Sequence, residues 1–291
     1  MRTWCPCAVC FRRAECAGGG EYHRWMEINL LVISVGNTRT AVGAFAGGEL
    51  TLVERVENTD LAGIGAAVGR VWAALKDGQD PAVAGASVNP GQARHIGRIV
   101  ADLIKQDVLW VRSGNSDDSE EGDGIPLPIR VLTEQPEQTG VDRVLNVAAA
   151  YEQIGKACCV VDAGTAVTVS FCNDKGEFLG GAIAPGVRLQ LGALHDKTAK
   201  LPETTLIAPS GLFGRSTTDS MHHGVYYGIR GMVKELIENF ATHLGTWPEM
   251  IATGGDAELL FGGWELAHAV SPDLTLYGVA LAYTEMESER V

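Results

Sequence analysis

The sequence predicts an α/β protein built from two related lobes. An apolar run, a glycine-centred turn and two further β-rich runs occupy residues 29–53, and the same order of features returns at residues 157–181. Ser34 in the first copy aligns with Asp162 in the second. A strand–turn–strand unit that occurs twice at this separation indicates two α/β halves. A cleft between two such lobes is a common place for a ligand.

The segments around the two copies alternate between helical and strand patterns, as an α/β fold requires. In the first half, the apolar spacing predicts helices at 60–76, 90–106 and 141–154 and strands at 81–88 and 107–112. In the second half, it predicts helices at 186–200, 217–245, 256–261 and 274–288 and a strand at 249–253.

The composition excludes some classes of partner. The chain has 291 residues, of which 46% are hydrophobic and 20% charged, and its formal net charge is −13. An acidic surface repels phosphate backbones, which disfavours nucleic acid or an anionic membrane as a partner. No run of 18 apolar residues occurs, so we expect no membrane span. Backbone N–H groups can still hold a nucleotide locally.

The cysteines fall into two groups. In the first group, four of them and one histidine lie within residues 1–25, without the spacing of a regular zinc finger: Cys5, Cys7, Cys10, Cys16 and His23. Zinc binding is one interpretation. We favour the other, a disordered leader that precedes a fold starting at Met26. The second group, Cys158, Cys159 and Cys172, lies in apolar strands and indicates core thiols in a reducing compartment.

Two turns are candidate phosphate sites. In Gly36-Asn37-Thr38, a glycine would let backbone N–H groups approach a phosphate, and the polar side chains could donate to its oxygens. The same residues would also suit an ordinary hairpin turn. Asp162 ends an apolar run before Gly164-Thr165, where a carboxylate would bind a cation or cap the turn.

Two further motifs contain candidate site residues. After Gly140, Asp142 and Arg143 occupy the first turn of a predicted helix. Asp142 suits the helix dipole, and it is also a candidate general base, with Arg143 as a partner for an anionic group. Gly254-Gly255 either ends a strand or leaves room for a flat ring on the backbone.

Taken in order, the GNT turn, GVDR, DAGTAVT and TGG resemble the motifs of type III pantothenate kinases over residues 27–286. The resemblance implies two ribonuclease-H-like lobes of the actin-like ATPase fold, at 26–140 and 141–291. It also implies a cytoplasmic homodimer that phosphorylates pantothenate with ATP at the first step of coenzyme A synthesis. The implied ions are Mg²⁺ and a monovalent cation, K⁺ or NH₄⁺.

The resemblance also assigns roles to residues. Asp142 would be the catalytic base, Asp162 would bind the monovalent cation, and Thr165, Gly254 and Gly255 would contact the nucleotide. Pantothenate would contact Thr133, Gly140, Val141, Asp142, Arg143 and Thr217. The ATP phosphates would lie against Ser34, Val35, Gly36, Asn37, Thr38, Arg39, Thr40 and Ala41.

Two positions differ from the family pattern. Ser34 replaces an aspartate in the first motif, and Thr133 replaces a tyrosine of the pantothenate pocket. The first change removes a charge near the metal, and the second alters the substrate pocket. Besides an active pantothenate kinase, the sequence therefore leaves open a catalytically weak, ligand-binding regulator and a kinase of another small hydroxy acid.

Overall fold

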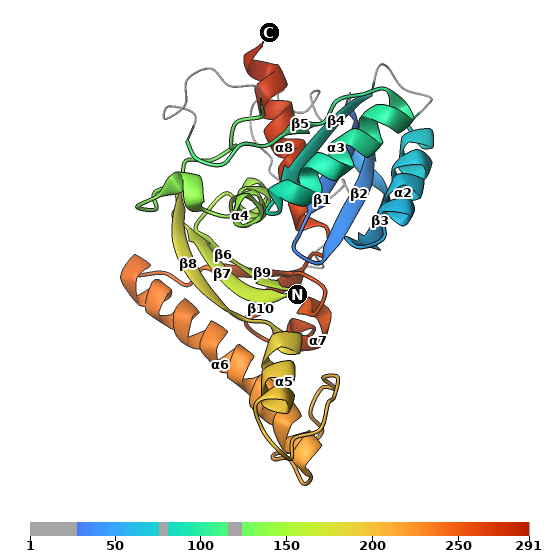
Figure 1. The fold of residues 1–291 in the computed structure, drawn as a ribbon. Helices are drawn as coiled ribbons and strands as arrows, with labels where there is room; N and C mark the ends of the chain where they lie inside the picture. The colour runs from blue at the N-terminus through green and yellow to red at the C-terminus, as the bar shows by residue number, and fades with distance from the viewer. Residues whose placement is uncertain (1–27, 76–80, 116–123, 291) are drawn as a thin grey trace. The chain divides into compact units, whose positions relative to one another are not determined.

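The computed structural model describes residues 28–75, 81–115 and 124–290 (Figure 1). The proposed leader, its four cysteines and Met26 lie outside these ranges. The described residues form two compact units: one contains those up to Gln153 together with those from Leu274 onward, and the other is Ile154–Asp273. Among the helices that the structure describes, none is long and apolar enough to cross a membrane.

The first unit is built on a five-stranded sheet. Its order is β3-β2-β1-β4-β5. Strand β2 runs antiparallel to its neighbours β1 and β3, and β4 and β5 run parallel to β1. The central strand β1 is apolar without interruption from Leu30 to Ile33 because both faces of the sheet are covered. The bounds are β1 Asn29–Val35, β2 Arg39–Ala46, β3 Glu49–Glu57, β4 Ala82–Ser87 and β5 Leu109–Trp110.

Two helices cover one face of this sheet. Helices α2 (Leu61–Ala73) and α3 (Pro90–Ile104) pack their buried side chains against alternate residues of β1 and β2. The side chain of Asp60 caps α2 by accepting from the Gly63 N–H at 2.8 Å, and that of Asn89 caps α3 by accepting from the Gln92 N–H at 3.1 Å. Asp and Asn are favoured at this position since they satisfy free N–H groups.

The other face is covered by the closing helix α8 (Leu274–Glu289), which contacts β1, β2 and β4. Helix α4 (Val141–Ile154) packs on α8, where the Thr275 hydroxyl donates to Asn146 Oδ1 at 2.7 Å. A Cβ added at Gly278 of α8 would lie 2.7 Å from the carbonyl carbon of Leu145. The two helices therefore approach each other more closely than any side chain at position 278 would allow.

The second unit repeats the arrangement, with a sheet of order β10-β9-β6-β7-β8. Antiparallel β6, β7 and β8 correspond to β1, β2 and β3, and parallel β9 and β10 correspond to β4 and β5. This confirms the internal repeat. The bounds are β6 Cys158–Ala163, β7 Ala166–Cys172, β8 Phe178–Pro185, β9 Glu249–Thr253, β10 Ala267–Val270, α5 Val187–Asp196, α6 Thr217–Leu244 and α7 Ala257–Phe261.

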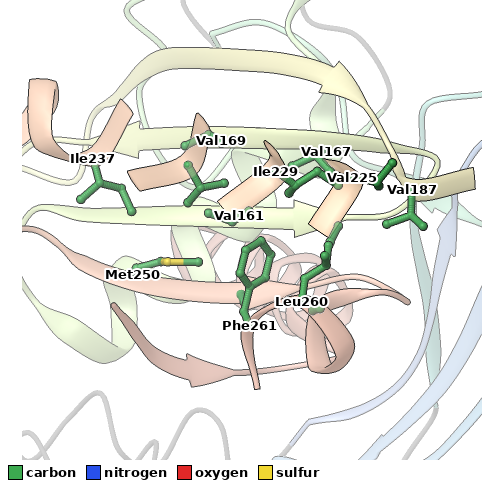
Figure 2. Packing of buried hydrophobic residues seen from close by; sticks show 14 of the residues in the cluster. Val161, Val167, Val169, Val187, Val225, Ile229, Ile237, Met250, Leu260 and Phe261 are labelled. Atoms are coloured by element: carbon green, nitrogen blue, oxygen red, sulfur yellow. The ribbon is translucent and has the colours of Figure 1, made fainter. Parts of the chain in front are cut away.

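The core of the second unit lies between its sheet and the long helix α6 (Figure 2). Val225, Ile229 and Ile237 of α6 occupy one face of that helix at spacings of four and eight residues. They face the valines of β6 and β7 shown in Figure 2. The sequence predicted α4 and β9 at their observed bounds, and it missed the short edge strand β10.

We expect Gly278→Ala to destabilise the first unit, because the added methyl would meet the backbone of α4. A matched control is Gly97→Ala in α3, where an added Cβ meets nothing within 4 Å. This control should gain about 0.5–1 kcal/mol, the usual preference for alanine over glycine inside a helix. Urea unfolding of both variants measures the difference. A Gly278→Ala protein as stable as the control would contradict the close packing of α4 and α8.

Candidate functional site

The turn between β1 and β2 is compact and exposed at its tip. The Gly36 N–H donates to the Arg39 carbonyl at 3.0 Å, and Asn37 is exposed to solvent. A Cβ at Gly36 would lie 3.2 Å from the Arg39 oxygen, so glycine suits this close approach. The turn thus places polar side chains and backbone directly after a buried strand, as the sequence predicted.

A residue that the sequence analysis missed holds this turn in place. Asn58, just after β3, donates from Nδ2 to the Gly36 carbonyl at 2.8 Å, and its backbone N–H donates to the Thr38 carbonyl at 2.9 Å. The buried Thr40 hydroxyl donates to Asn58 Oδ1 at 2.7 Å. An asparagine after a strand is a common turn residue, so the sequence alone carried no signal of this role.

Ser34 lies at the end of β1, between Ala41 of β2 and Ala86 of β4, and is half-buried. Its strand neighbours carry no charge. Over residues 28–75, 81–115 and 124–290, no three His, Cys, Asp or Glu side chains gather closely enough to hold a metal ion. A divalent ion at this turn would therefore need most of its ligands from phosphate and water.

The loop before α4 is organised by hydroxyl and glycine contacts. Thr133 and Thr139 share a hydrogen bond of 2.8 Å between their hydroxyls, which places Thr133 beside the residues that precede Gly140. Asp142 Oδ1 accepts from the Arg143 N–H at 2.7 Å. A Cβ at Gly140 would lie 2.8 Å from that Oδ1, so a glycine leaves room for the carboxylate.

The carboxyl group of Asp142 is electrostatically unusual. Burial raises its pKa above the ordinary value, against the lowering effects of the Arg143 N–H and the Arg143 charge. Burial also lowers the pKa of the Arg143 guanidinium, while the Asp142 charge opposes that shift. A carboxylate with a raised pKa binds a proton more readily, which suits a general base.

In the second unit, three segments meet at the turn Asp162–Thr165. Gly254, at the end of β9, has φ +95°, and a Cβ there would lie 2.6 Å from the Ala163 carbonyl and would overlap Asp162 Oδ1. The Asp256 N–H donates to the Ala163 carbonyl at 2.9 Å, and the Gly186 N–H donates to the Thr165 carbonyl at 3.0 Å. The structure therefore brings the DAGT and TGG motifs together within one unit.

Thr217 lies at the first turn of α6, where Ser216 caps the helix by accepting from the Asp219 N–H at 3.1 Å. Thr217 is exposed and lines an open groove of about 1150 Å³ between α5 and α6. The groove is apolar along Leu189, Leu194 and Met221, with Lys197 and Arg215 as its cationic residues.

Comparison with known proteins decides the family. The family model of type III pantothenate kinase matches residues 30–239, which include the first turn, the Asp142 loop and the Asp162 turn. The chain belongs to the type III pantothenate kinase family. Members of this family phosphorylate pantothenate in coenzyme A biosynthesis, and their kinase chemistry uses ATP and a divalent metal.

Similar type III pantothenate kinases cover almost the whole chain. Those of Geobacter sulfurreducens and Parafrankia sp. are 35% and 34% identical over 261 and 265 residues, which is 87% and 90% of this chain and 98% and 100% of theirs. That of Dehalococcoides mccartyi strain 195 is 31% identical over 263 residues, or 89% of this chain and 98% of its own.

Two solved structures share the fold. A conserved Baf family protein from Campylobacter jejuni has a TM-score of 0.53 at 18% identity and covers 90% of this chain and all of its own. Component A of (R)-2-hydroxyglutaryl-CoA dehydratase from Acidaminococcus fermentans has a TM-score of 0.53 at 14% identity, over 90% of this chain and 99% of its own. Both comparisons support the actin-like ATPase fold that the family resemblance implied.

The two glycines of the TGG motif should respond differently to alanine. Gly254→Ala should destabilise the second unit by about 1–3 kcal/mol or more, because an L-residue is strained at this φ and its Cβ meets the Asp162 turn. Gly255→Ala is the matched control, since a Cβ there meets nothing within 4 Å. Thermal unfolding distinguishes the two variants. Equal melting temperatures would contradict the tight contact between β9 and the Asp162 turn.

Proposed function

We propose that this chain phosphorylates pantothenate to 4′-phosphopantothenate with ATP, with Asp142 as the general base. The observation that supports this most directly is the half-buried carboxyl of Asp142, with its raised pKa, beside Arg143 at the start of α4. It lies within the segment that matches type III pantothenate kinases. In this mechanism, Asp142 accepts the proton of the substrate hydroxyl as that oxygen attacks the γ-phosphorus and the bond to ADP breaks.

Pantothenate would lie on the loop before α4. Gly140 and Val141 would contact it through the backbone, and Arg143 would bind its anionic group. Thr133 supports this placement because its hydroxyl already contacts Thr139, at the edge of the same loop. Thr217 would supply a further hydroxyl from the groove beside α6.

The ATP phosphates would lie on the first-unit turn, residues 34–41, where Gly36 and the exposed Asn37 leave the backbone accessible. Thr165 would contact ATP from the second unit. Gly254 and Gly255 would line the adenosine pocket. Gly255 is exposed and has no side chain, so the adenine ring would lie against its backbone.

Two ions complete the proposal. Mg²⁺ neutralises phosphate charge when bound, and Ser34 is the protein group at the turn that would contact the metal–phosphate unit through its hydroxyl. Asp162 would bind the monovalent cation, K⁺ or NH₄⁺, because its carboxylate is half-buried at the end of β6. The absence of a Cβ at Gly254 leaves room for that carboxylate.

We also propose that two copies of the chain form a homodimer through the second unit. The basis is a set of exposed apolar side chains on β8 and in the segment between α5 and α6: Ile183, Ile207, Leu212 and Phe213 are 66%, 69%, 91% and 69% exposed. All four belong to the second unit, and large exposed apolar side chains are a feature of interaction surfaces.

The direct test is a phosphorylation assay with ATP, pantothenate and a panel of other small hydroxy acids, with and without K⁺. Asp142→Asn should lose about 10²–10⁴-fold in rate, because the amide fills the same space but cannot accept the proton. Its stability at neutral pH should be equal or higher, since burial of the charged carboxylate is unfavourable. A folded variant that retains more than about a tenth of the wild-type rate would exclude Asp142 as the base.

The pH profile gives the same assignment independently. Because burial raises the Asp142 pKa, kcat/KM for the wild type should fall as the pH drops through a value above about 3.9, the ordinary value for aspartate. Asp142→Asn should lack this acid limb in its residual activity. An identical limb in both proteins would assign the titration to another group.

Ser34→Asp should raise the rate and lower the Mg²⁺ concentration needed for half-maximal activity, because it restores a carboxylate next to the metal–phosphate unit. Ser34→Asn is the matched control, with a similar size and no charge, and it should leave the Mg²⁺ requirement at or above that of the wild type. Titration of the rate with Mg²⁺ measures both. If Ser34→Asp is no better at any Mg²⁺ concentration, serine is adapted to this site and the missing charge has no cost.

A further inference from the structure

Asn58 makes an unusual number of hydrogen bonds for a half-buried residue at a strand end. Its Nδ2 donates to the Gly36 carbonyl, its Oδ1 accepts from the Thr40 hydroxyl, and its N–H donates to the Thr38 carbonyl, all within 2.9 Å. Its own carbonyl accepts from Gln92 Nε2 of α3 at 2.9 Å. Asn58 therefore connects the β1–β2 turn with both the end of β3 and the start of α3.

The orientation of the Asn58 amide is fixed by its partners. The Gly36 carbonyl can only accept a hydrogen bond, so Nδ2 must face it. Oδ1 then faces the Thr40 hydroxyl, which is fully buried. A buried hydroxyl without a partner would be unfavourable, so Thr40 holds the amide in this orientation.

These contacts control the direction of a backbone donor in the turn. In a planar trans peptide, the C=O and the following N–H point in opposite directions. Because Asn58 binds the Gly36 carbonyl, the Asn37 N–H points away from Asn58. Asn37 is the exposed tip of the turn, which is where a phosphate can approach.

We propose that Asn58 is a positioning residue for nucleotide binding: it holds the Gly36–Thr38 turn so that the Asn37 N–H is directed at a phosphate oxygen. Asn58 itself contacts the turn and not the ligand. This inference rests on the proposed function only in that the turn binds ATP phosphates, and it does not depend on which hydroxy acid is phosphorylated.

The test compares Asn58→Asp with the wild type. Aspartate keeps the acceptor for Thr40 but replaces the donor to Gly36 with a second oxygen, which repels the carbonyl. We expect the Kd for a non-hydrolysable ATP analogue, measured by calorimetry with Mg²⁺, to rise about tenfold, the effect of losing one well-placed hydrogen bond. KM for ATP should rise in parallel, while KM for pantothenate should change less than twofold.

Two further variants separate positioning from a general loss of stability. Thr40→Val keeps the shape of a buried residue and removes the hydroxyl that orients Asn58, so the Kd should rise about threefold, less than for Asn58→Asp. Asn173→Asp is the control: Asn173 holds the β7–β8 turn of the second unit, where its Nδ2 donates to Glu177 Oε2 at 2.8 Å, and aspartate replaces this donor with an oxygen that repels the Glu177 carboxylate. It should change the melting temperature without changing the Kd for the analogue.

These experiments distinguish a failure of the Asn58 inference from a failure of the proposed kinase function. If the wild type binds the analogue but does not phosphorylate pantothenate, the proposed function fails and the comparison of Kd values still decides the role of Asn58. If the wild type is active and folded Asn58→Asp binds the analogue within twofold of it, the inference is overturned. Should Asn58→Asp not fold, an unchanged Kd for Thr40→Val overturns it equally.

Discussion

The structure depends on the complete burial of the central strand of each sheet. In the first unit, Leu30–Ile33 of β1 are fully buried, and in the second, Cys158–Val161 of β6 are almost fully buried. Polar groups cannot be accommodated along such strands unless they are hydrogen-bonded, so they appear where the strands end. The ends of β1 and β6 are therefore the places where the fold can present backbone and polar side chains to a ligand.

The two copies of this turn are stabilised by different means. In the first, the side chain of Asn58 binds the turn, with its Nδ2 donating to the Gly36 carbonyl at 2.8 Å. In the second, the neighbouring segments approach so closely that Gly186 and Gly254 have no room for a side chain. The first turn is held by the side chain of Asn58, and the second by backbone hydrogen bonds and close contacts that leave no room for a Cβ at Gly186 or Gly254.

The loop before α4 illustrates a conflict between stability and chemistry. Burial raises the pKa of Asp142, so folding disfavours the charged form that a base requires, relative to the unfolded chain. The Arg143 N–H and charge compensate in part. Groups whose pKa is shifted in this way are typical of functional sites. The absence of a Cβ at Gly140 leaves the space that the Asp142 carboxylate occupies.

By itself, the sequence determined the α/β class, the repeat and the helix at 141–154, because periodicity and glycine-centred turns are local signals. Tertiary structure decided the rest. Strand β10 was missed because four residues at a sheet edge carry too little pattern. Helix α8 is apolar on all sides over residues 276–282, so its sequence does not show that it packs on β1 of the first unit. The role of Asn58 depends on partners 18 to 34 residues away, and only folding brings such donors and acceptors into contact.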